Sequence, residues 1–176
     1  NSTPSAGTLS YTSGGFVSGT TFGRWFTATG AGTTIAAAAD ATGAAGRYPF
    51  VNSLNIDRSA SIERNTPAAA AGVLAVTYTA ATGSSVISAT DGAATVDRKG
   101  NDTWAVSVLS GTPTAAASLE LQLLGSGTFG APLTAANTRI IQGATFVGTH
   151  QGGTVTPGGQ RLLTPTEIVS GPFSLA

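Results

Sequence analysis

The clearest alternation of apolar and polar positions lies in residues 103–124. Every second position there carries a large apolar side chain, in two runs: Trp104, Val106 and Val108, then Leu119, Leu121 and Leu123. A period of two places these side chains on one face of a strand, so each run predicts a strand with one buried and one wet face. Gly111 and Pro113 interrupt the alternation between the runs. We therefore expect a pair of antiparallel core strands, to which the other strands are added.

Shorter alternating segments predict further strands. Residues 73–80 and 86–90 are expected to form a hairpin, followed by a tight turn at Asp91-Gly92. Leu54 and Ile56 share one parity and are expected to face the core. Other short strands are predicted at residues 24–26, 33–37, 95–96 and 137–147, with a polar loop at 97–102. The sum is about eight to ten short strands, which predicts an all-β fold, an antiparallel β-sandwich or barrel.

Both ends of the chain differ from this pattern and predict extended arms. Residues 1–23 space apolar side chains through small uncharged ones, whereas flexible tails, the alternative, are usually poor in aromatic residues. Residues 161–176 contain Pro165 and Pro172, which remove ladder donors and favour an edge strand or a docked arm. The predicted organisation is an N-terminal arm (1–23), a β core (24–160) and a C-terminal arm or edge strand (161–176). The expected subunit contacts are Leu9, Tyr11, Phe16, Phe22, Leu162, Leu163, Ile168 and Phe173.

The scarcity of charge limits the possible partners. Charged residues make up 9% of the 176 residues, with eight basic and eight acidic side chains, against about 25% in an average soluble protein. Such a chain lacks the basic surface needed to bind nucleic acid or an anionic membrane. No apolar run approaches the ~20 residues of a membrane span. A net charge near zero favours association, which is typical of a subunit in an assembly or of a secreted protein.

Candidate chemistry is sparse. His150 is the single histidine and lies in a glycine-rich loop sequence without a G-x-S-x-G partner, and cysteine is absent, so we predict no enzyme and no cofactor. Asp97, Asn101 and Asp102 bring three oxygen-bearing side chains within six residues, which makes them candidate calcium ligands. An ordinary polar hairpin loop is the alternative. Trp25 and Trp104 occupy strand patterns and are expected in the core, where neither could stack on a sugar.

The densest group of charged residues comprises Asp57, Arg58, Glu63 and Arg64. Two interpretations remain open for this group. The first is a set of surface ion pairs, which contribute little to stability. The second is a contact between subunits.

The segment T-A-T-G-A-G-T-T-I-A-A-A-A-D-A-T-G, residues 27–43, resembles the small-residue strand-and-turn sequences of tailed-bacteriophage virion proteins. Head decoration (cement) proteins and short head fibres are the most similar in style. The resemblance implies a trimeric or otherwise symmetric β protein, clamped on capsid subunits by its arms. The function expected is that of a structural protein on the virion surface, which stabilises the shell at subunit junctions.

Two other functions stay open at this point. A secreted, extracellular filament or pilus-like subunit would join its neighbours by strand donation. A carbohydrate-binding β-sandwich would carry an exposed aromatic platform.

Overall fold

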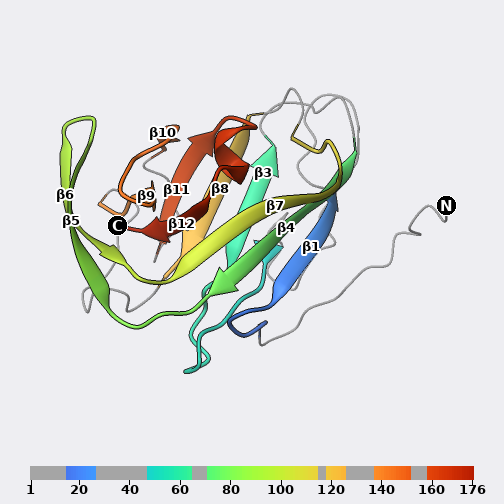
Figure 1. The fold of residues 1–176 in the computed structure, drawn as a ribbon, viewed down its shortest axis with the longest axis horizontal. Coiled ribbons are helices and arrows are strands. Elements are labelled where there is room, and N and C mark those ends of the chain that lie inside the picture. The colour runs from blue at the N-terminus through green and yellow to red at the C-terminus, as the bar shows by residue number, and fades with distance from the viewer. Residues whose placement is uncertain (1–14, 27–46, 65–70, 115–117, 126–136, 152–157) are drawn as a thin grey trace.

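The computed structural model describes residues 15–26, 47–64, 71–114, 118–125, 137–151 and 158–176. These residues form two five-stranded antiparallel sheets packed face to face, with a two-stranded ribbon at one end (Figure 1). The all-β prediction is therefore confirmed. In order, the first sheet contains β1 (Thr21–Phe26), β4 (Gly72–Thr79), β7 (Thr103–Gly111), β12 (Pro172–Leu175) and β9 (Ile140–Gln142). The second contains β10 (Thr149–His150), β11 (Gly158–Leu163), β8 (Leu119–Leu124), β3 (Ala60–Arg64) and β2 (Arg47–Tyr48). The ribbon consists of β5 (Ser84–Asp91) and β6 (Ala94–Gly100), and a 3-10 turn, η1, covers Glu167–Val169.

The two runs of residues 103–124 are strands, but they do not pair with each other. β7 pairs with β4 and β12 in the first sheet, whereas β8 pairs with β11 and β3 in the second. The prediction of an antiparallel core pair was therefore wrong. Trp104 and Leu121, one from each run, are fully buried in the same core. Alternation reveals which face of a strand is buried, and both faces here turn to one core from opposite sheets.

One long bent hairpin carries β4, β5, β6 and β7. β4 continues into β5 through residues 80–83, and β6 continues into β7 through residues 101–102, while β5 pairs with β6 alone. The predicted hairpin between 73–80 and 86–90 was wrong, because those strands follow one another along the same arm. The predicted turn at Asp91-Gly92 is confirmed: Gly92 has a φ of +62° at the tip. Residues 97–100, expected in a loop, belong to β6.

The segment before β3 is a turn, and this corrects the prediction that Leu54 and Ile56 face the core. Leu54 is 76% exposed and Ile56 is half-buried. The side-chain oxygen of Asn52 accepts hydrogen bonds from the backbone N–H groups of both residues, at 3.0 and 2.9 Å. Asn55 adopts a φ of +59°. Asparagine stabilises such turns through its own side chain, which competes with strand formation.

The C-terminal residues are part of the sandwich, which contradicts the predicted arm or edge strand. β11 lies between β10 and β8, and β12 lies between β7 and β9. Leu163, Ile168 and Phe173 are at most 1% exposed, so they are unavailable to a neighbouring subunit. Leu162 lies on the outer side of β11 and is half-buried. Pro172 is tolerated because it is the first residue of its strand.

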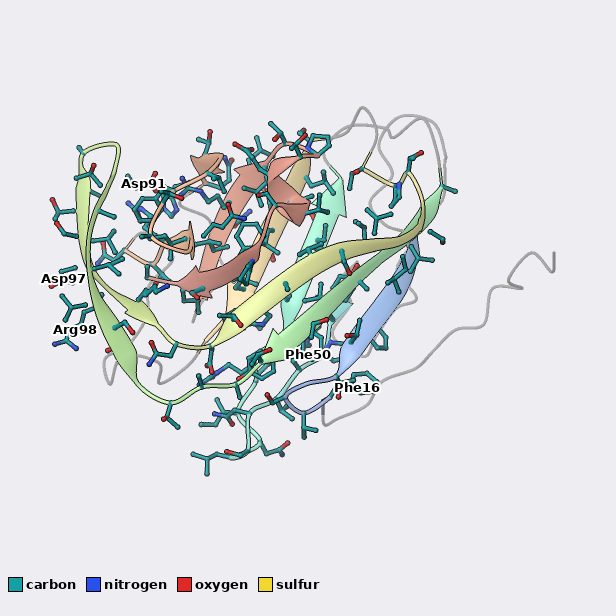
Figure 2. The ribbon with its side chains drawn as sticks, in the orientation of Figure 1. Phe16, Phe50, Asp91, Asp97 and Arg98 are labelled. Carbon is teal, nitrogen blue, oxygen red and sulfur yellow. The ribbon has the colours of Figure 1, made fainter. Side chains whose placement is uncertain are left out.

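The N-terminal part of the described chain also packs on its own core. Phe16 forms a parallel bridge with Phe50, and its ring lies 4.9 Å from that of Phe22 (Figure 2). Phe22 in turn makes an edge contact with Tyr48 at 6.1 Å. Phe16 and Phe22 thus join the two sheets of one molecule; both are half-buried, and their contact with a neighbouring subunit stays a prediction. Leu9 and Tyr11, the strand predicted at 33–37 and the side chain of Trp25 lie outside the described residues.

Candidate functional site

The outer side of the first sheet, over β1, β4 and β7, forms an extended surface on which the described side chains carry no charge. Leu74, Val76, Tyr78, Trp104 and Val106 point into the core, so the alternate residues point outward. We call the outward set the uncharged face: Thr21, Gly23, Val73, Ala75, Thr77, Thr79, Thr103, Ala105, Ser107 and Leu109. Ala75 is fully buried, whereas the other nine are half-buried or exposed. Its members are small, hydroxylated or aliphatic. The lack of charge is the one property that this face shares with the cores of protein–protein interfaces, which are depleted in charged side chains.

The centre of the uncharged face is apolar and tightly packed. The register of β4 and β7 shifts between Val73 and Leu74, which leaves Leu109 as an extra residue on β7. Leu109 is 60% exposed. A Cβ atom at Gly23 would lie 3.1 Å from Val73 Cγ1 and 3.3 Å from Leu109 Cδ1, so these two side chains extend over the glycine. The bulge therefore directs an apolar side chain onto the middle of the face.

Threonine pairs flank this apolar centre. Thr21 lies opposite Thr77, and their hydroxyl oxygens are 2.7 Å apart in a hydrogen bond. Thr79 lies opposite Thr103 on the neighbouring pair of strands. Cross-strand threonine pairs satisfy one another and stabilise the sheet.

The few charged side chains instead hold the bent hairpin to the rest of the sandwich. At the bend, Arg58 donates to Asp102 at 2.9 Å, and the two side chains are 6% and 9% exposed. Asp102 also accepts the backbone N–H of Ala81 at 2.8 Å, while Trp104 donates to the carbonyl of Arg58 at 2.7 Å. Surface ion pairs were one interpretation of the cluster that contains Asp57, Arg58, Glu63 and Arg64. For Arg58 that interpretation is wrong. Its partner lies 44 residues away, and the pair is buried.

A second ionic cluster fixes the tip of the hairpin. Arg161, 1% exposed, donates to both oxygens of Asp91 at 2.7 and 2.9 Å, and Arg139 approaches the same carboxylate at 3.2 Å. Hydrogen bonds from Arg161 lower the pKa of Asp91. Burial, followed by the charge of Arg139, lowers the pKa of the neighbouring His150. Figure 2 shows Asp91 on the side of the ribbon facing β9 and β10, whereas Asp97 and Arg98 point away from the body.

Two more charged pairs lie on and beside the second sheet. Arg47 and Asp57 form a part-exposed ion pair at 2.6 Å, as the surface interpretation predicted for this region. Glu63 lies directly opposite Glu120, whose carboxylate accepts a hydrogen bond from the side chain of Gln122 at 2.7 Å. Burial, followed by the charge of Glu120, raises the pKa of Glu63. The outer side of this sheet is thus acidic and amide-rich, unlike that of the first.

Two of the three candidate calcium ligands, Asn101 and Asp102, are engaged elsewhere, and Asp97 is an exposed residue of β6. The two carboxylate oxygens of Asp102 accept from Arg58 and Ala81. The side chain of Asn101 donates to the carbonyl of Thr82 at 2.8 Å and accepts from Ser85 at 2.6 Å. These groups stabilise the bend of the hairpin. Within the described ranges, no three or more Asp, Glu, His or Cys side chains gather as metal ligands would.

A shallow cavity of about 400 Å³ opens beside the bend. It lies between residues 52–54 and residues 80–83, with Arg58 and Asp102 in its wall. The turn around Asn52 and the long-range ion pair create this hollow, and neither feature has a signal in local sequence periodicity. The cavity contains no histidine or cysteine, and its charged groups neutralise each other. His150, the one histidine, lies in β10 at the opposite end of the hairpin, beside Asp91.

The exposed large apolar side chains among the described residues are all aliphatic: Val17, Leu54, Val86, Val108, Leu109 and Val169. The aromatic platform that a carbohydrate-binding sandwich would need is therefore not found in this part of the chain. Trp104 is fully buried, as predicted. Over the same ranges, no helix has the length and apolar character needed to cross a membrane.

Protein-family models, curated proteins and solved structures were compared with the chain, and none matches. The function of this molecule therefore has to be inferred from its fold and its surfaces.

Proposed function

We propose that the protein is a non-enzymatic structural subunit that binds neighbouring proteins through the uncharged face. The assembly that its sequence style indicates is a viral particle. There the sandwich would lie on the outer surface and stabilise the shell at junctions between capsid subunits.

The uncharged face is the observation that carries this proposal. Ten outward positions on three adjacent strands hold no charged residue. Seven charged side chains elsewhere form four ion pairs within the molecule. Charge is therefore used to fix the fold, while the broad flat surface is left for packing. Burial of such a surface contributes about 25 cal/mol per Å² of apolar area.

In this proposal the uncharged face, and not the terminal arms, makes the main contact with neighbouring proteins. Phe16, Phe22, Leu163, Ile168 and Phe173 stabilise their own sandwich. The contact is instead made by a rigid sheet, which loses little conformational entropy on binding. A rigid face also fixes the orientation of the subunit on its partner.

Reassociation with the native particle tests the proposal. Particles stripped of the protein by mild guanidinium are mixed with purified protein and sedimented. We expect the wild type to cosediment and Ser107→Lys to bind at least tenfold more weakly, because a charge would be buried at the centre of the contact. Ser88→Lys, at an exposed position of the ribbon, is the matched control and should bind like the wild type. Equal binding of Ser107→Lys, or absence of the protein from every native particle, would overturn the proposal.

A further inference from the structure

We propose that β1 is a dimerisation edge: it pairs antiparallel with β1 of a second copy and joins two first sheets into one ten-stranded sheet. This goes beyond the proposed function, because it concerns contact between copies of this chain and not contact with the shell.

The argument begins with the other edges of the two sheets, which are blunted. β2 and β10, at the edges of the second sheet, are two residues long, and Pro49 follows β2 directly. β9, at the far edge of the first sheet, has three residues and runs into the turn at Gly143. Lys99 donates to the carbonyl of Gly143 at 2.8 Å and covers that turn. Short strands, prolines and charged side chains are the usual protection of sheet edges against pairing.

The ribbon edges are protected in a different way. The pairing of β5 and β6 shifts register between Val86 and Ala89, which twists the ribbon and interrupts a regular edge. Asp97 and Arg98 project outward from β6 (Figure 2). A second strand added here would meet an irregular and charged edge.

β1 lacks most of these protections, and Arg24 is its one charged residue. It is six residues long and contains no proline, and its register with β4 runs without a shift from Thr21 to Phe26. In the described part of the chain, β1 pairs with β4 alone. An unprotected regular edge presents a row of N–H and C=O groups that a second strand can satisfy.

The edge is also self-complementary. A twofold axis perpendicular to the sheet pairs β1 antiparallel with itself and keeps the outer faces of both copies on the same side. An axis through Gly23 places Arg24, the one charge of the strand, opposite Phe22 of the second copy and avoids an arginine–arginine pair. Five paired residues then form about four to six inter-strand hydrogen bonds. The uncharged faces of the two copies then lie on the same side of one continuous, twisted sheet.

Cross-linking gives the test, since the chain has no native cysteine. In this register, four residues separate Thr21 from its copy, or about 14 Å along the strands. We expect Thr21→Cys to be cross-linked into dimers by a bismaleimide of about that span. Ser88→Cys, on the remote ribbon, is the matched control and should remain monomeric under the same treatment. Sedimentation equilibrium of the untreated wild type should show a dimer at about 10 µM.

Three results would overturn the inference: a monomer at up to about 100 µM, a closed trimer, or a dimer that Thr21→Cys fails to cross-link. Ser107→Lys separates this inference from the proposed function. It should lose particle binding while keeping the dimer, because Ser107 lies on β7, two strands away from the dimerisation edge.

Discussion

Asp102→Ala should be the most damaging single substitution among the charged residues. The change removes the partner of a guanidinium that is 6% exposed, and it also removes the acceptor for the backbone N–H of Ala81. Breaking a buried ion pair from one side costs about 3–5 kcal/mol, because the remaining charge is left unpaired. For a domain of this size, each kcal/mol lowers Tm by about 2–4 °C, so a decrease of about 6–20 °C is expected.

Urea unfolding followed by tryptophan fluorescence measures this loss, since Trp104 is buried and bonded to the carbonyl of Arg58. Asp57→Ala is the matched control. Its ion pair with Arg47 is as short, at 2.6 Å, but the aspartate side chain is 45% exposed, so the cost should be about 1 kcal/mol. The double replacement Arg58→Met with Asp102→Leu should recover more than half of the loss, because no charge is left buried. If Asp102→Ala costs no more than Asp57→Ala, the buried pair does not hold the bend.

The remaining predictions concern backbone strain and pH. Gly111→Ala should cost about 3 kcal/mol or more, because its Cβ would lie 2.2 Å from the carbonyl oxygen of Ala71; Gly92→Ala, with a similar φ but nothing within 4 Å, should cost about 1 kcal/mol in the same urea assay. Since the folded pKa of Glu63 is raised, its stability contribution is present at low pH and is lost as pH rises. Glu63→Gln should therefore raise Tm at pH 7 and leave it unchanged at pH 3; a gain at both values would contradict this. The lowered pKa of Asp91 gives the opposite pH dependence. Asp91 stabilises the fold at pH values above the ordinary carboxyl pKa, and this stabilisation is lost as pH falls through the folded pKa. The protection factors for hydrogen exchange in β5 and β6 should therefore fall in acid, after correction for the intrinsic exchange rate at each pH, and Asp91→Asn should remove this response.

Alternation in the sequence predicted strand faces well and strand partners poorly. Residues 103–124 contain two strands with the expected buried side chains, yet they belong to opposite sheets. Pairing depends on which sheet each strand joins, and periodicity carries no information on that. Leu54 shows a related failure, because the side chain of Asn52 stabilised a turn where parity alone predicted a strand.

The candidate site was predictable only in part. The low proportion of charged residues is consistent with a surface without ionic groups, but it does not identify the strands that carry such a surface. Arg58 and Arg161 are buried because Asp102 and Asp91 neutralise them from 44 and 70 residues away. Such contacts have no local signal, since only the folded chain brings the partners together. The C-terminal prolines were likewise consistent with an edge, whereas Pro172 begins an internal strand.

The lack of charge on the described outer side of β1, β4 and β7 sets how the proposed contact should respond to solution conditions. Sodium chloride screens ionic attraction and should leave such a contact nearly unchanged. Ammonium sulfate should strengthen it, and cooling should weaken it, because apolar hydration becomes less unfavourable in the cold. An assembly held by such contacts would be stable at high sodium chloride concentration and weaker at low temperature.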